Sequence, residues 1–417
     1  MNLNPSYKQS EVGVIPNEWE IVPISELVSE FRGGAPLKPS DFTNSGIKVL
    51  PKGGVGRKGW LTIEDADLQY CSPSYATSHR NNQVDQNFTI VVLRDLVPSG
   101  PSIGLIVQIK EPETFVLAQG VYGFKVNERS DPCYLIQLSN TRWYRLLMNS
   151  IMVGSTQVHI TNTAFKAAKI PLPPLPEQRT IATALSDVDM LLAAQDKVIA
   201  KKRDIKQAAM QQLLTGKQRL QGFTGEWEVK RLGDVLKEIA DGATPSTANR
   251  DNFDGSISWV VIDDIKDEIW ATKNTLSEKG LLSCAATLWQ PGTLILSTGA
   301  TIGEVGIARV PVATKQGICG LVFDAQSMST EFMKYWFVLN KPLLLSKAQG
   351  SSIKEVRAPT LIQFEVHLPY LDEQTTIATI LSDMDADLTA LEQQRDKTRA
   401  LKQGMMQELL TGRIRLV

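Results

Sequence analysis

The sequence predicts an α+β protein in which two mixed α/β domains are separated by two long helices packed as an antiparallel coiled coil. An internal pseudo-twofold repeat is expected to relate the two halves. A 49-residue segment occurs twice, at Leu172–Leu220 and Leu368–Leu416, and 27 of the 49 aligned positions are identical without a gap. Chance would give about three identities. Each copy has helical spacing of its apolar residues, whereas the longer segment before it has short β-rich runs.

The repeat and the composition divide the chain into five predicted segments. An N-terminal arm comes first, and each of two globular segments is followed by a helical tail. Their predicted bounds are 1–17 for the arm, 18–169 and 222–366 for the globular segments, and 170–221 and 367–417 for the tails.

Both globular segments are predicted to be mixed α/β domains. Short β-branched and aromatic runs recur between glycine- and proline-rich turns, which is typical of strands. The predicted strands are Phe88–Leu93, Ile103–Ile109, Val121–Val126, Ile257–Ile262, Thr293–Leu296 and Gly320–Phe323. Late in each segment a longer run predicts one helix, at Tyr134–Asn149 and at Thr330–Leu345.

Each tail is predicted to form one long helix. Pro176 suits a first helical turn, and no proline or glycine follows until Gly216, which suits a helix end. About 38 residues would span about 57 Å. Apolar residues at alternating steps of four and three predict a seam between two helices, although each helix could instead pack on its own domain. The predicted seam residues are Ile181, Leu185, Val188, Leu192, Ile377, Leu381, Met384, Leu388 and Leu391.

Composition excludes several classes of protein. The formal net charge is −1, so the chain as a whole is not basic, although local basic patches remain possible. No apolar stretch approaches the roughly 18 residues that a membrane span needs. The N-terminus has no secretory signal pattern, and the four cysteines form no closely spaced pair. We therefore expect a cytoplasmic protein with reduced thiols.

The residues that catalysis needs are few. The three histidines have no metal-ligand spacing, and neither a phosphate-binding loop nor a nucleophile elbow is present in the sequence. Gly299–Gly303 lacks the order of glycines that a dinucleotide site requires. The sequence therefore predicts no catalytic residue, no cofactor-binding residue and no metal ligand, which favours a recognition or scaffold role.

Basic and polar loops are the candidates for contact with nucleic acid. Between Phe31 and Trp60 the chain has six basic residues, one acidic residue and many glycines. Such a loop can approach phosphates closely, and polar loops near residues 79 and 244 could reach base edges. An ordinary solvated loop is the alternative for each. The DNA-binding candidates are Arg32, Lys52, Arg57, Lys58, His79, Arg80, Asn81, Thr244, Ser246, Arg250, Lys315 and Gln316.

The repeated tail resembles the conserved region of type I restriction–modification specificity subunits. The motif is Leu-Pro-x-Leu-x-Glu-Gln, followed by Ile-Ala, Leu-Ser-Asp and Leu-Leu-Thr-Gly. Around Gly242–Ser246 and Ser297–Gly303, the second globular segment is similar to that family's target recognition domain. The first segment departs from this pattern at Gly33–Pro36 and Val49–Lys52.

This resemblance implies a non-catalytic subunit that reads double-stranded DNA. Each target recognition domain would read one half of an asymmetric bipartite target, while the helices set the spacer and dock the methylases. The implied partners are two methylase subunits, which use S-adenosylmethionine, and restriction subunits that translocate DNA with ATP and Mg. The alternative is a non-DNA scaffold, a two-domain assembly adaptor, which the near-neutral charge leaves open.

Overall fold

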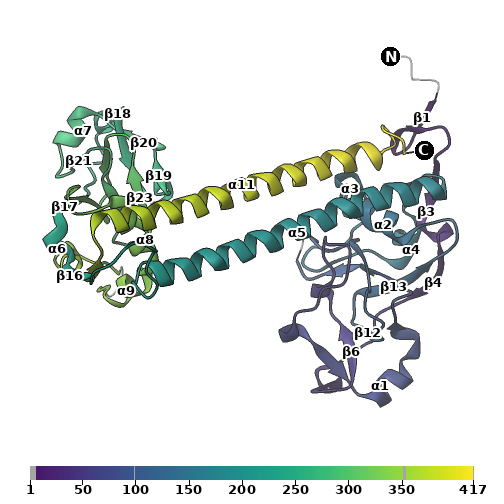
Figure 1. Cartoon of the computed structure of the whole chain (residues 1–417). Helices are drawn as coiled ribbons and strands as arrows, with labels where there is room; N and C mark the ends of the chain where they lie inside the picture. Colours follow the sequence, from purple (N-terminus) through teal and green to yellow (C-terminus); the bar gives the residue numbers. More distant parts are fainter. Residues whose placement is uncertain (1–5, 98, 351–353, 417) are drawn as a thin grey trace. The chain divides into compact units, whose positions relative to one another are not determined.

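The computed structural model describes residues 6–97, 99–350 and 354–416 (Figure 1). The chain forms two compact units. Unit 1 comprises Met1–Asp196 and Gln393–Val417, and unit 2 comprises Lys197–Glu392. Each unit therefore contains one globular segment together with part of both long helices. The predicted α+β fold with two domains, two long helices and an internal repeat is confirmed.

Unit 1 is built on two sheets and three short strand pairs within the described residues. One sheet is antiparallel, in the order β11 (Ile106–Gln108), β9 (Thr89–Val92), β13 (Val121–Val126) and β4 (Val28–Arg32). The other has the order β5 (Phe42–Thr43), β7 (Gln69–Cys71), β6 (Ile47–Leu50), β12 (Phe115–Leu117) and β8 (Gln83–Val84). The pairs are β1 (Tyr7–Ser10) with β2 (Gly13–Pro16), β3 (Glu20–Pro23) with β15 (Lys169–Leu172), and β10 (Arg94–Asp95) with β14 (Val158–His159).

Unit 2 repeats this plan across the residues that the structure describes. Its first sheet has the order β17 (Leu236–Asp241), β25 (Ile318–Phe323), β22 (Leu294–Ser297), β23 (Val305–Ala308) and β19 (Glu268–Ile269). Its second has the order β20 (Asn274–Leu276), β18 (Phe253–Val260), β24 (Val312–Thr314) and β21 (Leu288–Trp289). A pair joins β16 (Glu228–Arg231) to β26 (Glu365–Leu368).

Short helices cover the sheets in both units. In unit 1 they are α1 (Pro73–Ser78), α2 (Pro132–Ser139), α3 (Arg142–Ser150) and α4 (Asn162–Ala167). In unit 2 they are α6 (Leu232–Val235), α7 (Glu278–Leu282), α8 (Thr330–Leu339), α9 (Lys341–Ser346) and α10 (Ala358–Leu361).

The two predicted single helices are wrong, because each is broken into two. In unit 1, α2 ends before Asn140, and the Thr141 side chain accepts a hydrogen bond from the Tyr144 N–H at the start of α3. In unit 2, Asn340 separates α8 from α9. In unit 1 the Thr141 cap starts a new helix without interrupting the apolar pattern. In unit 2 Pro342, in the first turn of α9, has no backbone N–H with which to continue the hydrogen bonds of α8.

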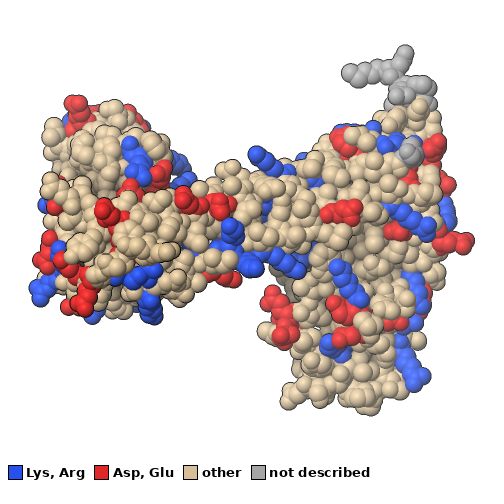
Figure 2. Space-filling view, in the orientation of Figure 1, with Lys and Arg blue, Asp and Glu red and all other residues tan. Residues whose placement is uncertain are grey.

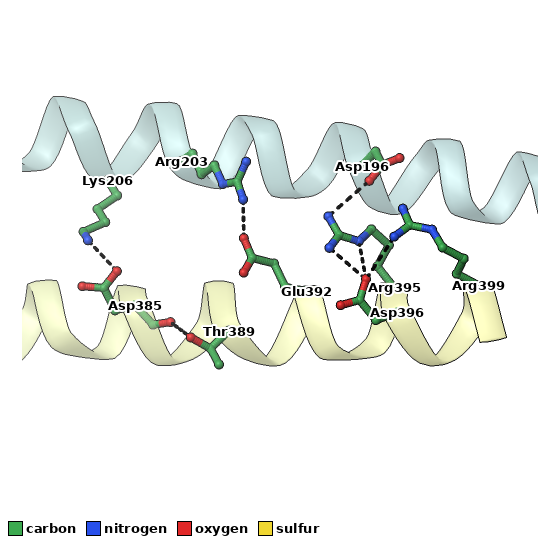
Figure 3. A network of polar contacts seen from close by, with 9 residues as sticks. All are labelled: Asp196, Arg203, Lys206, Asp385, Thr389, Glu392, Arg395, Asp396 and Arg399. Carbon is green, nitrogen blue, oxygen red and sulfur yellow. Dashed lines mark hydrogen bonds and ion pairs between the residues drawn. The ribbon is translucent and has the colours of Figure 1, made fainter. Parts of the chain in front are cut away.

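The long helices are α5 (Leu175–Leu213) and α11 (Leu371–Leu409), each of 39 residues. The cation–carboxylate pairs between them have an antiparallel order. In unit 1, Asp189 pairs with Lys402 and Asp196 with Arg395. In unit 2, Arg203 pairs with Glu392 and Lys206 with Asp385 (Figure 3). In each unit the residue number rises along α5 as it falls along α11.

The predicted seam residues are buried or half-buried in the helical parts of each unit. Ile181 and Leu185 lie in the core of unit 1 with Leu409 and Leu410 from the end of α11. The same core contains Trp19, Tyr134 and many other residues of the globular segment. Ile377 and Leu381 pack correspondingly with Met210, Leu213 and Leu214 in unit 2. Both predicted packing arrangements therefore occur at once, because the start of each long helix packs on its own domain and on the other helix.

An arginine–glutamate clasp joins the end of one tail to the start of the other helix in each unit. Arg415 donates to both Glu177 carboxylate oxygens, at 2.5 and 2.8 Å, and the Glu177 side chain is 1% exposed. Arg219 donates to both oxygens of Glu373 at 2.8 and 2.7 Å. Because two parallel hydrogen bonds fix both position and orientation, these clasps define the register of the helices.

The glutamine that follows each glutamate ties the long helix to its domain through backbone atoms. The Gln178 side chain accepts from the Asp131 N–H at 2.9 Å and donates to the Arg129 carbonyl at 2.9 Å. Gln374 accepts from the Ser329 N–H at 3.0 Å and donates to the Ser327 carbonyl at 3.2 Å. Asp131 and Ser329 cap α2 and α8, so the same contact anchors the equivalent helix in both units.

Candidate nucleic-acid interface

Each unit has a pair of parallel strands that stop at the same end, and these two strand ends, here called edges, are equivalent in the two units. In unit 1, β6 pairs with β12, and the Ala118 N–H donates to the Leu50 carbonyl just beyond the pair. In unit 2, β18 pairs with β24, and the Lys315 N–H donates to the Val260 carbonyl. The chain leaves both strands of a parallel pair at one edge, so the loops that follow meet there. This edge carries Lys52 in unit 1 and Lys315 in unit 2.

A glycine brings a third loop to each of these edges. A Cβ on Gly34 would lie 2.1 Å from the Ala118 carbonyl oxygen, and one on Gly242 would lie 2.2 Å from that of Thr314. Only glycine permits such a close approach. The sequence difference at Gly33–Pro36 therefore leaves the local geometry unchanged, and the two loops are equivalent.

A four-residue turn presents a glutamine at the same edge of each unit. The turns are Ala118–Val121 and Lys315–Ile318, each closed by a hydrogen bond of 3.0 Å from the last N–H to the first carbonyl. Their third residues, Gly120 and Gly317, have φ angles of +89° and +82°. Glycine suits this position, and the preceding Gln119 and Gln316 are exposed.

The basic candidates of unit 1 separate into two groups. Lys52 begins the turn at Lys52–Gly54 beside the parallel edge. Arg57 and Lys58 are exposed and line an open cavity of about 410 Å³ with Trp60, and the lining also includes Gly53 and Gly54 of the turn that Lys52 begins. Among the described residues, these three cations have no carboxylate within ion-pair distance. Arg32 differs, because it pairs with Glu30, donates to the Gln83 carbonyl and lies over the Phe88 ring.

The polar candidates at residues 79–81 lie beside the glycine loop of unit 1. His79 stacks on Tyr75 with 4.0 Å between ring centroids and is half-buried. Arg80 and Asn81 are exposed on the turn Arg80–Asn82, and Asn82 donates to the Gly33 carbonyl at 2.8 Å. The structure therefore brings Arg80 and Asn81 to the glycine loop.

All five candidates of unit 2 are exposed. Thr244 and Ser246 follow Ala243, whose N–H donates to the Thr314 carbonyl at 3.0 Å, next to Lys315 and Gln316. Arg250 begins a further turn, Arg250–Asn252, in which Asn252 donates to the Ser246 carbonyl at 3.0 Å. These contacts connect the candidates in one continuous loop region.

Sequence analysis missed two features of these surfaces. The Asp241 carboxylate accepts from the Gly317 N–H at 3.1 Å and so connects the glycine loop to the glutamine turn, while burial raises its pKa. In unit 1, the Lys110 ammonium lies 3.9 Å from the centroid of the Trp60 ring, beside the cavity. Neither pair is close in sequence, so no local pattern could reveal it.

Charge is locally mixed on both units. Lysine and arginine side chains are interspersed with aspartate and glutamate on the face shown in Figure 2. Across residues 6–97, 99–350 and 354–416, no group of three His, Cys, Asp or Glu side chains could hold a metal ion. The helices within these ranges also include none that is long and apolar enough to cross a membrane.

Comparison with known proteins identifies the family. The model for the type I restriction modification DNA specificity domain matches residues 16–201 and again residues 224–398. The chain therefore belongs to this family and contains two copies of its domain, which confirms the resemblance drawn from the tails. A specificity subunit is the non-catalytic member of its system.

Individual relatives match along nearly the whole chain. The putative type I restriction enzyme MjaX specificity subunit of Methanocaldococcus jannaschii is 23% identical, over 99% of this chain and 97% of that protein. The solved type I restriction–modification S subunit from M. genitalium has a TM-score of 0.59 at 13% identity, over 98% of each chain. A chain from a structural study of type I system assembly and conformational transition has a TM-score of 0.62 at 17% identity, over 96% of this chain and 99% of that chain. These two structures share the fold.

Proposed function

We propose that this chain is the DNA sequence-recognition subunit of a type I restriction–modification complex. Its target recognition domains, residues 18–169 and 222–366, each read one half of an asymmetric bipartite target. The long helices set the spacer between the halves and dock the methylase subunits. The family supports the general role, and the scaffold alternative has no support from it.

One observation supports the division into two half-sites above all. The two units have equivalent edges, each built from a parallel strand pair, a glycine loop and a glutamine turn. Their side chains nevertheless differ, because unit 1 has the half-buried Lys52 and the exposed Arg80 and Asn81, whereas unit 2 has the exposed Thr244, Ser246 and Lys315. Equivalent docking with different side chains is what reading two different sequences requires.

The partners follow from the same role. Each unit has one equivalent place where the start of one long helix is joined to the end of the other tail. Two such places favour two methylase copies, which would use S-adenosylmethionine. The restriction subunits would supply ATP- and Mg-dependent translocation and cleavage. This chain itself would bind no cofactor and catalyse no reaction. It would act in the cytoplasm, where the DNA is.

Changing Arg80 and Asn81 to alanine should relax only the half-site that unit 1 reads. Both side chains are exposed beside the glycine loop, and arginine or asparagine can make paired hydrogen bonds to a base edge. We expect discrimination to fall roughly tenfold at the contacted base pair. The measurement is binding by the complex with its methylase subunits, on targets mutated in one half at a time. Equal loss in both halves, or in neither, would contradict base reading by these residues.

Changing Arg57 or Lys58 to alanine should weaken binding to all sequences alike. Both are exposed cations without an ion-pair partner among the described residues, so we expect them to contact phosphates. Losing one such contact should lower the slope of log affinity against log salt by about one. Arg129, which pairs with Glu20 and Glu26, is the matched control because its charge is already compensated. An unchanged salt slope in both variants would show that Arg57 and Lys58 do not contact the DNA phosphates.

A further inference from the structure

One segment of unit 2 has an equivalent in unit 1 at a constant offset of 205 residues, Ser72–Val84 against Ser277–Trp289. Each begins with a serine that caps a short helix, since Ser72 accepts from the Tyr75 N–H and Ser277 from the Gly280 N–H. Each ends in a two-residue strand, β8 or β21, that pairs antiparallel with the equivalent strand β12 or β24. The two segments are therefore the same structural element.

Burial agrees with this equivalence. The residues that precede the caps, Cys71 and Leu276, are both 0% exposed. Val84 and Trp289, in the closing strands, are each 1% exposed. The buried positions at both ends of the element thus match, which allows the exposed positions between them to be compared.

Some exposed positions change from polar in unit 1 to apolar in unit 2, whereas Ser78 and Ser283 are exposed and polar in both. Where unit 1 has the exposed Thr77 and Arg80, unit 2 has Leu282 and Ala285, and Leu288 stands where unit 1 has the half-buried Gln83. Leu282 is 85% exposed and Leu288 is 38% exposed, and Ala285 is also exposed. We call these three residues of unit 2 the apolar patch.

The apolar patch adjoins the candidate interface of unit 2. A Cβ on Gly280, in the same helix α7, would lie 2.0 Å from the Asn252 carbonyl oxygen. Ser277 and Lys279 contact Asp251 through a hydrogen bond of 2.6 Å to its carbonyl and an ion pair of 3.0 Å. Asn252 in turn donates to Ser246. The element that carries Leu282 therefore packs on the loop that carries Ser246 and Arg250.

We propose that the apolar patch reads thymine, by contact of Leu282 with its C5 methyl group in the major groove. This inference rests on the proposed function and names a residue that determines specificity in the second half-site. Apolar side chains recognise thymine by this methyl group, whereas arginine and asparagine recognise guanine and adenine by hydrogen bonds. The equivalent element would thus read purines in one half-site and thymine in the other.

The difference between the units favours DNA over a protein as the occupant of the patch. A protein that docked in the same way on both units would meet Thr77 and Arg80 on one and Leu282 and Ala285 on the other. At these two positions the units have no common chemistry. A half-site that differs in sequence from its counterpart accounts for the difference directly.

The test uses the complex with its methylase subunits and a target defined by mapping methylated adenines in host DNA. Each thymine in the half-site of unit 2 is replaced in turn by deoxyuridine, which removes only the methyl group. The wild-type complex should lose about fourfold in affinity at the contacted position, the contribution of one buried methyl-sized group. The complex with Leu282→Ser should bind the thymine and uracil targets equally.

Val229→Ala supplies the matched control, because Val229 is 55% exposed in unit 2 but lies on β16, outside the patch. It should keep the fourfold preference for thymine. A half-site without thymine, a wild-type complex indifferent to the methyl group, or an unchanged preference in Leu282→Ser would overturn the inference. Sequence-specific binding by the wild-type complex in those cases would leave the proposed function standing, whereas its absence would overturn both.

Discussion

Replacing Arg415 with alanine is expected to destabilise unit 1 by about 3 kcal/mol, because the change leaves the buried Glu177 carboxylate without its cation. Among the described residues, the Glu177 carboxylate would keep only the hydrogen bond from the Trp19 indole N–H, at 3.0 Å. The clasp also holds the end of the second tail, so its loss should free that segment. The free energy of unfolding of the full chain, from urea denaturation, measures the effect.

Arg413→Ala is the matched control for this prediction. Arg413 lies two residues away, its side chain is 59% exposed, and it pairs with Glu408 at 3.5 Å. An exposed pair of this kind contributes about 0–1 kcal/mol. Arg219→Ala should act on unit 2 in the same direction as Arg415→Ala acts on unit 1. Equal stabilities of the Arg413 and Arg415 variants would show that the clasp contributes no more than a surface contact.

Replacing Leu185 or Leu381 with alanine is expected to cost about 2–5 kcal/mol, because each leucine is 0% exposed and its loss leaves a cavity. Each lies where a long helix, its domain and the end of the other long helix meet. The cavity would therefore weaken three sets of contacts together. Urea denaturation of the full chain reports the loss of stability.

Leu191→Ala is the control, since Leu191 lies on the same helix as Leu185 but is 50% exposed. It should change the free energy of unfolding by less than about 0.5 kcal/mol, as is usual for surface positions. Similar losses for Leu185→Ala and Leu191→Ala would contradict the position assigned to the apolar face of α5.

The long helices could be predicted closely, because their signals are local. Prolines precede them, glycines follow them, and the apolar spacing is regular in between. What surrounds their apolar face could not be predicted in full. Spacing identifies which side of a helix is buried but not what covers it, and here Leu185 contacts a core that also contains Trp19 and Tyr134.

The candidate interface could be predicted only in part. Charge and glycine content indicated Lys52, Arg57 and Lys58, but the contacts of Arg32 with the Gln83 carbonyl and the Phe88 ring depend on folding. The sequences of the Gly34 and Gly242 loops do not reveal that the loops are equivalent. The close approach of two backbones requires the glycine itself but allows the neighbouring residues to differ. Leu282 was missed because a leucine in sequence suggests a core position, and only the structure shows that it faces solvent.

The contacts of Gln178 and Gln374 have a consequence for how such a protein can change over generations. Each glutamine holds its domain through backbone N–H and carbonyl groups, which every residue except proline provides. A substituted or exchanged domain can therefore attach to the same helices as long as its backbone path is kept. New DNA preferences can then arise by replacing one domain as a module, while the two long helices are inherited unaltered.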